Sequence, residues 1–193
     1  MLDISTEPLS RLAEHARIST AFRVARAFEV RNETRNARPV LEERAVAAPY
    51  IKDYDAIPGN APADWLVRFD TSHWTLFSAW LAGERVGGAV VARRTPELQK
   101  RNDVALLWDL RVDPRHRARG IGSALLRVVE IWAQSNGCAE LRIETQTSNV
   151  AACRLYQSRG CTLLSVDRFA YPELPDEVRL IWQKDLIAGS AAR

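Results

Sequence analysis

The sequence predicts an α/β (α+β) fold in which a central mixed β-sheet is flanked by helices. Five strand-like segments precede the first long helical pattern, and helices then alternate with strands. The fifth segment, VALLWDLRV at 104–112, is nearly continuously apolar, which is typical of a central strand covered on both faces. From Ile121 to Trp132, apolar residues instead recur at helical spacing.

The first half of the chain is predicted to consist mainly of strands. Residues 1–17 are polar and are expected to form a short helix or a tail. Strands are expected at 18–30, 40–47, 73–83 and 84–94, with a turn between the first two. The stretch 48–65 holds three of the nine prolines, so we expect a loop there, with a short helix around 62–69.

The second half shows clear signals for helix ends. Asn136-Gly137 supplies a stop for the helix that opens after Asp113-Pro114. Asn149 is placed to cap a second helix, which Gly160 ends. Strands are expected at 139–146, 161–170 and 178–186.

The composition is that of an ordinary globular domain. The chain has 193 residues, of which 26% are charged and 47% hydrophobic, and its formal net charge is +3. This charge is far from that of a nucleic-acid-binding protein, so no nucleic acid is expected as a partner. No apolar run approaches the roughly 18 residues of a membrane span, and the N-terminal residues lack a signal-peptide pattern.

The three cysteines, Cys138, Cys153 and Cys161, have neither CxxC nor zinc-ligand spacing. We therefore expect reduced thiols in a cytoplasmic protein without a metal site. Cys153 lies among apolar helical residues with no histidine nearby in the sequence, so we expect it to be a core residue rather than an acyl carrier.

The stretch RHRARGIGSALL, residues 115–126, places positive charge and two glycines at the start of a helix. A helix N-terminus carries unpaired N–H groups and the positive end of the helix dipole. Gly120 and Gly122 let an anion approach the backbone, while Arg117 and Arg119 can pair with phosphate oxygens. The pattern suits a diphosphate, although by itself it fits a solvated loop equally well. Neither a P-loop nor a dinucleotide GxGxxG pattern is present.

The run LWDLRVDPRHRARGIGSALL, followed by RIETQTSNVAACRLYQSRG, resembles the two central motifs of the GNAT acetyltransferase superfamily. The matching residues are Arg117, Gly120 and Gly122 in the first motif and Asn149, Ala152 and Tyr156 in the second. The stretches APYIKDY, ETQ, NVAAC and SVD further resemble streptothricin acetyltransferases. Cys161 departs from the pattern, because an aromatic residue usually follows the glycine there, and we expect only a packing consequence.

The resemblance implies a GNAT fold with a splayed sheet, acetyl-coenzyme A as cofactor, and one domain at 18–187 between tails at 1–17 and 188–193. Residues 104–160 would bind the cofactor, with its pantetheine arm in the opening between strands 104–112 and 139–146. The flanking parts, 18–100 and 161–187, would form the acceptor side. The implied cofactor-binding residues are Leu110, Arg111, Val112, Arg117, Ala118, Arg119, Gly120, Ile121, Gly122, Ser123, Asn149, Ala152 and Tyr156.

The resemblance assigns Tyr156 the role of the acid that protonates the leaving sulfur, and a phenol stays protonated at neutral pH. The acceptor amine, with a pKa near about 10.4, must lose a proton before it attacks. Asp109 and Glu144 are the candidate bases, and Trp108 replaces the first member of the Glu-Asp pair seen in related enzymes. Ion pairs with the arginines two residues away, or proton removal through water, remain alternatives.

Aromatic and acidic side chains together suit a cationic acceptor. The candidate substrate-binding residues are Trp108, Asp109, Glu144, Tyr50 and Asp167. We expect a small amine, streptothricin-like or polyamine-like. Acetylation of a protein or peptide, and a non-catalytic acyl-coenzyme A sensor, are the alternatives. A homodimer that covers a strand edge is also expected.

Overall fold

The computed structural model describes residues 1–31, 39–98, 101–174 and 176–186. The chain divides into two compact units. The first unit holds residues 1–21, 53–142 and 185–193, and the second holds 22–52 and 143–184. The expected tail at 188–193 and most of the expected turn at 31–39 lie outside the described residues.

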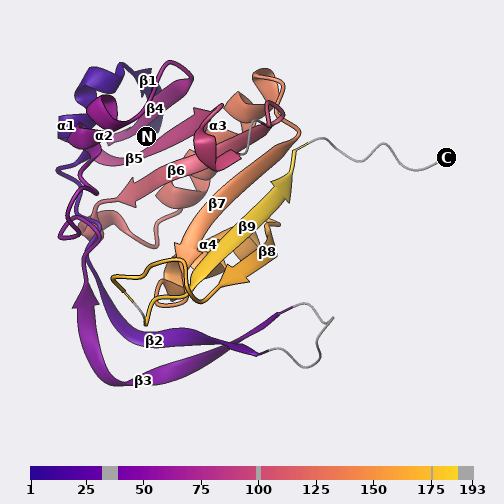
Figure 1. The fold of residues 1–193 in the computed structure, drawn as a ribbon. Helices are drawn as coiled ribbons and strands as arrows, with labels where there is room; N and C mark the ends of the chain where they lie inside the picture. The colour runs from indigo at the N-terminus through magenta and orange to yellow at the C-terminus, as the bar shows by residue number, and fades with distance from the viewer. Residues whose placement is uncertain (32–38, 99–100, 175, 187–193) are drawn as a thin grey trace. The chain divides into compact units, whose positions relative to one another are not determined.

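The described residues of the first unit form four strands and three helices, which Figure 1 labels. They are β1 (Leu2–Glu7), α1 (Leu12–His15), α2 (Pro62–Arg68), β4 (Trp74–Leu81), β5 (Glu84–Arg93), β6 (Val104–Val112) and α3 (Ile121–Ser135). Short 3-10 turns occupy Leu9–Arg11, Pro96–Leu98 and Pro114–His116. The second unit holds β2 (Phe22–Arg31), β3 (Val40–Lys52), α4 (Val150–Ser158), β8 (Thr162–Asp167) and most of β9 (Arg179–Asp185). Strand β7 (Glu140–Gln146) begins in the first unit and continues in the second.

The main sheet is seven-stranded, in the order β1-β4-β5-β6-β7-β9-β8, and β2 and β3 form a separate two-stranded sheet. The pairs β1-β4, β4-β5, β5-β6 and β8-β9 are antiparallel. Strands β6 and β7 are neighbours joined through the 15-residue helix α3, which is the crossover connection that parallel strands require. The sheet is therefore mixed, as the sequence predicted.

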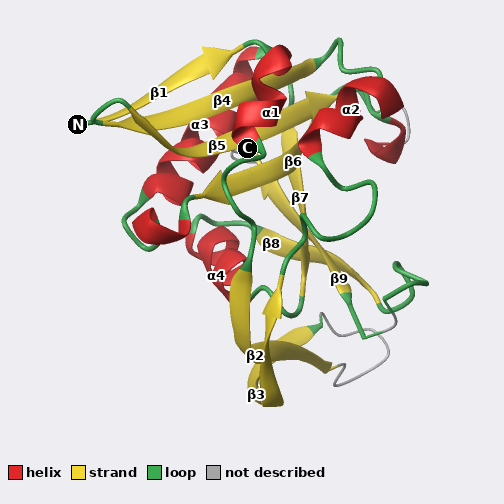
Figure 2. Ribbon diagram, turned by 90° about the vertical axis from the view of Figure 1, so that its left-hand side faces the viewer, coloured by secondary structure: helices red, strands yellow, loops and turns green. Residues whose placement is uncertain are grey.

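Two consecutive glycines in β5 show how helices cover the sheet of the first unit. A Cβ on Gly87 would meet Ile121 and Leu125 of α3 at 3.2 Å, whereas one on Gly88 would meet His15 of α1 at 2.5 Å. Successive residues of a strand point to opposite faces, so α1 and α3 cover opposite faces of β5 (Figure 2). Both glycines stand where a helix side chain approaches the strand closely.

The expectation of a tail or short helix over residues 1–17 is wrong for 2–7. These residues form the edge strand β1, which pairs with β4 from Leu2 opposite Leu81 to Glu7 opposite Leu76. The helix α1 that follows buries Leu12 and His15 completely or nearly so. The sequence signal is weak because β1 is short and its partner lies about 70 residues away.

The second predicted strand is longer than expected. Strand β3 continues to Lys52, which pairs with Phe22 of β2, although a loop was predicted from Ala48. The register shifts between Val24 and Arg26, and this irregularity accommodates the extra β3 residues, Pro49 among them.

The helix predictions are confirmed. Helix α3 begins after Gly120 and is followed by Gly137 in the left-handed conformation. Helix α4 is capped by Asn149, whose side-chain oxygen accepts a hydrogen bond from the Ala152 N–H at 3.1 Å. Helix α2 has Pro62 in its first turn. Among the helices of the described residues, none is long and apolar enough to cross a bilayer.

Candidate active site

The loop before α3 has the geometry of an anion-binding site. Ala118 and Gly120 adopt left-handed backbone conformations, with φ of 59° and 85°, and both are exposed. The first helical hydrogen bond runs from the Ala124 N–H to the Gly120 carbonyl, so the N–H groups of 121–123 have no acceptor within the helix. No heavy atom lies within 4 Å of where a Gly120 Cβ would stand. N–H groups without a helical acceptor, next to left-handed residues at a helix N-terminus, fit a diphosphate.

The two arginines of this loop are used differently. The Arg117 guanidinium donates to three backbone carbonyls, those of Val112 at 3.0 Å, Ala21 at 2.7 Å and Ser19 at 2.9 Å. It therefore ties segment 19–21 to the end of β6, a role that the sequence analysis did not anticipate. Burial lowers the pKa of Arg117 below its usual value. Arg119 is exposed and has no hydrogen bond or ion pair within the described residues, so its charge is available to phosphate oxygens.

Strand β6 contains a β-bulge next to the candidate base. Asp109 pairs with Val90 of β5, whereas Leu107 pairs with the next residue, Val91, which leaves Trp108 as the extra residue. Because of the bulge, Trp108 and Asp109 face the same side of the sheet, the side covered by α1 and α2. Their contacts agree, since Asp109 bonds His15 of α1 and Trp108 packs on the ring of Phe69 at the end of α2.

Asp109 lies in a buried network of hydrogen bonds and ion pairs. Its Oδ2 accepts from His15 Nε2 at 2.8 Å and from Arg111 Nε at 2.6 Å. Arg111 also pairs with Asp55 at 2.8 Å and donates to the Ile18 carbonyl. The ion pair with Arg111, which the sequence left open as the alternative to a catalytic role, is thus present.

Burial alone would raise the pKa of Asp109. The hydrogen bond from His15, together with the charges of His15 and Arg111, outweighs this effect and lowers the pKa. A carboxylate with a lowered pKa and two strong donors has little tendency to accept a proton from an ammonium group. The geometry therefore favours a structural role for Asp109.

We expect Asp109→Asn to lower the free energy of unfolding at pH 7 by about 1–3 kcal/mol, because it weakens hydrogen bonds to a buried charge. Since the folded-state pKa of Asp109 is lowered, its contribution is present above the unfolded value of about 3.9 and is lost as the pH falls through the folded value. Urea titrations of both proteins between pH 7 and pH 3 measure the difference. A difference that stays constant over this range would contradict the assignment.

Trp108 was a candidate substrate-binding residue, and the structure packs it against the core. Its ring centroid lies 4.4 Å from that of Trp74 and 6.1 Å from that of Trp65. These rings belong to a cluster that also contains Leu12 and Leu76. Trp108 thereby joins α2 to the strands beneath it, and any contact with an acceptor would involve only the part of the ring that remains exposed.

The second candidate base, Glu144, has different surroundings. Its side chain is 41% exposed, and its Oε1 accepts from the Tyr171 hydroxyl at 2.6 Å. Gln146 Nε2 donates to the same hydroxyl at 2.7 Å. Arg142, the partner in the alternative ion pair, donates instead to Glu140. Glu144 is therefore an accessible carboxylate held by a phenol.

Helix α4 carries the residues of the second motif. Tyr156 is 5% exposed and lies two turns after Asn149, the cap residue. Cys153, between them, is fully buried, as predicted for a core residue. Burial raises the pKa of the Cys153 thiol to about 11, so it is not a nucleophile at neutral pH. Tyr156 therefore remains the candidate acid that the resemblance implies for this helix.

Two further candidates from the acceptor side lie in the second unit. Tyr50 is 44% exposed, and burial of its hydroxyl, with the nearby charge of Glu177, raises its pKa. Asp167 pairs with Arg179 at 2.9 Å and accepts from the Phe169 N–H. The structure thus gives Asp167 a role at the end of β8, while Tyr50 remains open to solvent.

Sequence reasoning missed the residues that hold the two carboxylates. His15 lies 94 residues from Asp109, and the polar segment that contains it gave no signal of a buried imidazole. Tyr171 was recognisable as an aromatic residue in a late loop, but nothing local linked it, or Gln146, to Glu144.

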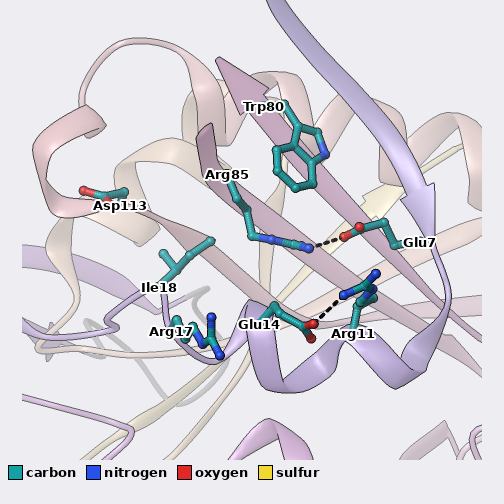
Figure 3. A pocket seen from close by; sticks show the side chains of 8 residues that line it. All are labelled: Glu7, Arg11, Glu14, Arg17, Ile18, Trp80, Arg85 and Asp113. Carbon is teal, nitrogen blue, oxygen red and sulfur yellow. Dashed lines mark hydrogen bonds and ion pairs between the residues drawn. The ribbon is translucent and has the colours of Figure 1, made fainter. Parts of the chain in front are cut away.

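A cavity of about 390 Å³ lies in the first unit (Figure 3). Its lining residues are Glu7, Arg11, Glu14, Arg17, Ile18, Trp80, Arg85 and Asp113. Arg85 pairs with Glu7 at 2.6 Å over the Trp80 ring, and Arg11 pairs with Glu14 at 2.7 Å. The lining therefore carries three positive and three negative side chains.

A mixed sheet whose bulged central strand leads into a helix N-terminus suited to an anion defines an α/β protein with a candidate site for a phosphorylated cofactor. The chain belongs to the acetyltransferase (GNAT) family, whose family model matches residues 25–161. This membership confirms the fold class and the superfamily that the sequence predicted.

Individual relatives agree with this family. A streptothricin acetyltransferase of Escherichia coli is 37% identical over 84 residues, which are 42% of this chain and 48% of the relative. The ribosomal protein bS18-alanine N-acetyltransferase of Escherichia coli K12 is 37% identical over 70 residues, 36% of this chain and 47% of the relative. The matched stretch thus spans about half the length of these curated relatives.

Solved structures share the fold over nearly the whole chain. A Bacillus anthracis protein described as a streptothricin acetyltransferase, solved with acetyl coenzyme A, has a TM-score of 0.77 and 24% identity. The alignment covers 96% of this chain and 99% of that one. A nourseothricin acetyltransferase has a TM-score of 0.75 and 22% identity, with 96% and 98% covered.

Proposed function

We propose that this protein is an acetyl-coenzyme A-dependent N-acetyltransferase that transfers acetyl directly to a primary amine of a small cationic acceptor, streptothricin-like or polyamine-like. One observation carries the proposal: the α3 N-terminus presents unpaired N–H groups, left-handed Ala118 and Gly120, and an uncommitted Arg119. The likeness to streptothricin acetyltransferases supports the acceptor class.

The N–H groups of 121–123 and the Arg119 guanidinium would hold the diphosphate. The backbone of Leu110 and Val112 would pair with the pantetheine amides. The resemblance also implies a cofactor-binding role for Asn149 and Ala152, at the start of α4. Acetyl-coenzyme A, when bound, supplies an acetyl group activated as a thioester.

The amine nitrogen forms a bond to the carbonyl carbon, and the carbon–sulfur bond breaks. An ammonium group loses two protons on becoming an amide. Glu144, directly or through one water, accepts the first and passes it to solvent. Tyr156 donates its hydroxyl proton to the departing sulfur and is restored by the second. No covalent enzyme intermediate is required, and the buried, un-ionised Cys153 offers none.

Glu144 suits the base role better than Asp109. Glu144 is accessible and has one close donor, whereas both donors to Asp109 are parts of a buried network. Asp109 then holds α1 against β6.

The test follows free thiol release from acetyl-coenzyme A with streptothricin, spermidine, lysine peptides and peptides with an N-terminal alanine. We expect release with the first two. Glu144→Gln should lower turnover about a hundred- to ten-thousand-fold, which is the usual contribution of a general base to the rate. Release only with peptides would favour the peptide acetyltransferase to which bS18-alanine acetyltransferases point. Coenzyme A binding without release on any acceptor would favour a sensor and overturn the proposal.

A further inference from the structure

Three side chains of the second unit form a hydrogen-bond chain that ends on Glu144. Gln146 Nε2 donates to the Tyr171 hydroxyl at 2.7 Å, and that hydroxyl lies 2.6 Å from Glu144 Oε1. The amide N–H can only donate, so the single proton of the phenol points toward the carboxylate. Glu144 thus receives a charge-assisted hydrogen bond of fixed direction.

The other oxygen of Glu144 is left for a different partner. Its Oε2 lies 3.9 Å from Arg179 Nη1, too far for a hydrogen bond, and Arg179 is held at 2.9 Å by Asp167. Tyr171, Arg179 and Asp167 are the titratable or charged groups that these contacts place around the carboxylate. One oxygen is therefore restrained and one is accessible, which is the arrangement that a proton acceptor needs.

The described residues of the loop that carries Tyr171, 168–174 and 176–178, are anchored at both ends, so the contact with Glu144 does not depend on a loose surface side chain. At its start, Arg168 donates to the Val30 carbonyl at 2.8 Å. At its end, the largely buried Glu177 pairs with Lys52 at 2.8 Å and accepts from the Ser148 hydroxyl at 3.2 Å. These contacts hold the loop in the position in which Tyr171 reaches Glu144 of β7.

We propose that Tyr171 is a positioning residue, which holds Glu144 so that its free oxygen accepts the proton of the acceptor amine. The proposal rests on the function given above and adds a residue to it. Burial, and next the charge of Glu144, raise the pKa of Tyr171 well above its usual value, so the phenol stays protonated throughout the working pH range. It acts as a donor and exchanges no proton with the substrate.

Tyr171→Phe tests the proposal, because it removes only the hydroxyl. We expect kcat to fall about tenfold with the KM for acetyl-coenzyme A unchanged, a loss smaller than that of the base itself. A general disturbance of the fold would raise that KM as well, so the split between kcat and KM distinguishes positioning from loss of structure.

A double-mutant cycle separates positioning from a general structural role. In a Glu144→Gln background, Tyr171→Phe should change kcat/KM by less than about twofold. Ser158→Ala, which removes a hydroxyl from the end of α4, is the control and should leave kcat and KM unchanged. Should Tyr171→Phe not fold, Gln146→Met releases the phenol from the other side, and kcat should fall by less, again with the KM for acetyl-coenzyme A unchanged.

Multiplicative losses in the double variant, or an unchanged kcat in Tyr171→Phe, would overturn the positioning role. Failure of the proposed function looks different. Wild-type protein would then release no thiol, or Glu144→Gln would turn over normally, whereas failure of the positioning role alone leaves both of these results as expected.

Discussion

Tyr156→Phe lowers kcat about a hundredfold or more and leaves the KM for acetyl-coenzyme A within about twofold. The substitution removes the proton that the leaving sulfur receives, and it keeps the ring that α4 buries at this position. The variant loses a proton transfer in the transition state but still binds acetyl-coenzyme A in the ground state. The substitution therefore lowers kcat and leaves KM nearly unchanged.

Steady-state kinetics, with streptothricin or spermidine saturating, measure this effect. Thermal unfolding of the variant serves as the control, because a melting temperature close to that of the wild type shows that the buried ring still packs. Unchanged turnover would remove Tyr156 from the reaction and assign protonation of the sulfur to solvent.

Gly120→Val weakens coenzyme A binding at least about a hundredfold, because the substitution has two separate effects on the diphosphate loop. Gly120 has φ of 85°, a left-handed conformation that costs an L-residue about 1–2 kcal/mol, and β-branched residues adopt it least readily. The new side chain also enters the open space outside the loop, where the proposal places the phosphates. Calorimetric titration with coenzyme A measures the loss.

Gly137→Val is the matched control. Gly137 lies just after the other end of α3, has φ of 77° and, like Gly120, has no heavy atom within 4 Å of its missing Cβ. The Gly137→Val variant should therefore lose a similar amount of unfolding free energy and should bind coenzyme A as tightly as the wild type. Equal loss of affinity in both variants would mean that strain, rather than occupation of the anion site, explains the result, and the site would then lie elsewhere.

The sequence predicted most of what depends on local signals. Gly120 and Gly137 mark the ends of α3, Asn149 caps α4, and the uninterrupted apolar run at 104–112 is β6. Each is set by backbone preference or by the periodicity of neighbouring side chains, which can be read within a few residues.

The remaining features depend on partners distant in the chain. His15 meets Asp109 only because α1 packs on the face of β5 that Gly88 leaves open. Arg117 binds the carbonyls of 19 and 21 across more than 90 residues, so its chemistry could not be separated from that of Arg119 in the same loop. Burial and pairing across such separations have no local signature.

The bulge at Trp108 also has no local signal in the sequence, and it has a consequence for β6. Leu107 and Asp109 pair with adjacent residues of β5. The parts of β6 before and after Trp108 therefore follow one continuous register along β5. Trp108 is a self-contained insertion: a chain lacking it would still direct Leu107 and Asp109 to their present faces. The indole that buttresses α2 and the carboxylate that anchors α1 can therefore be gained or lost independently of each other.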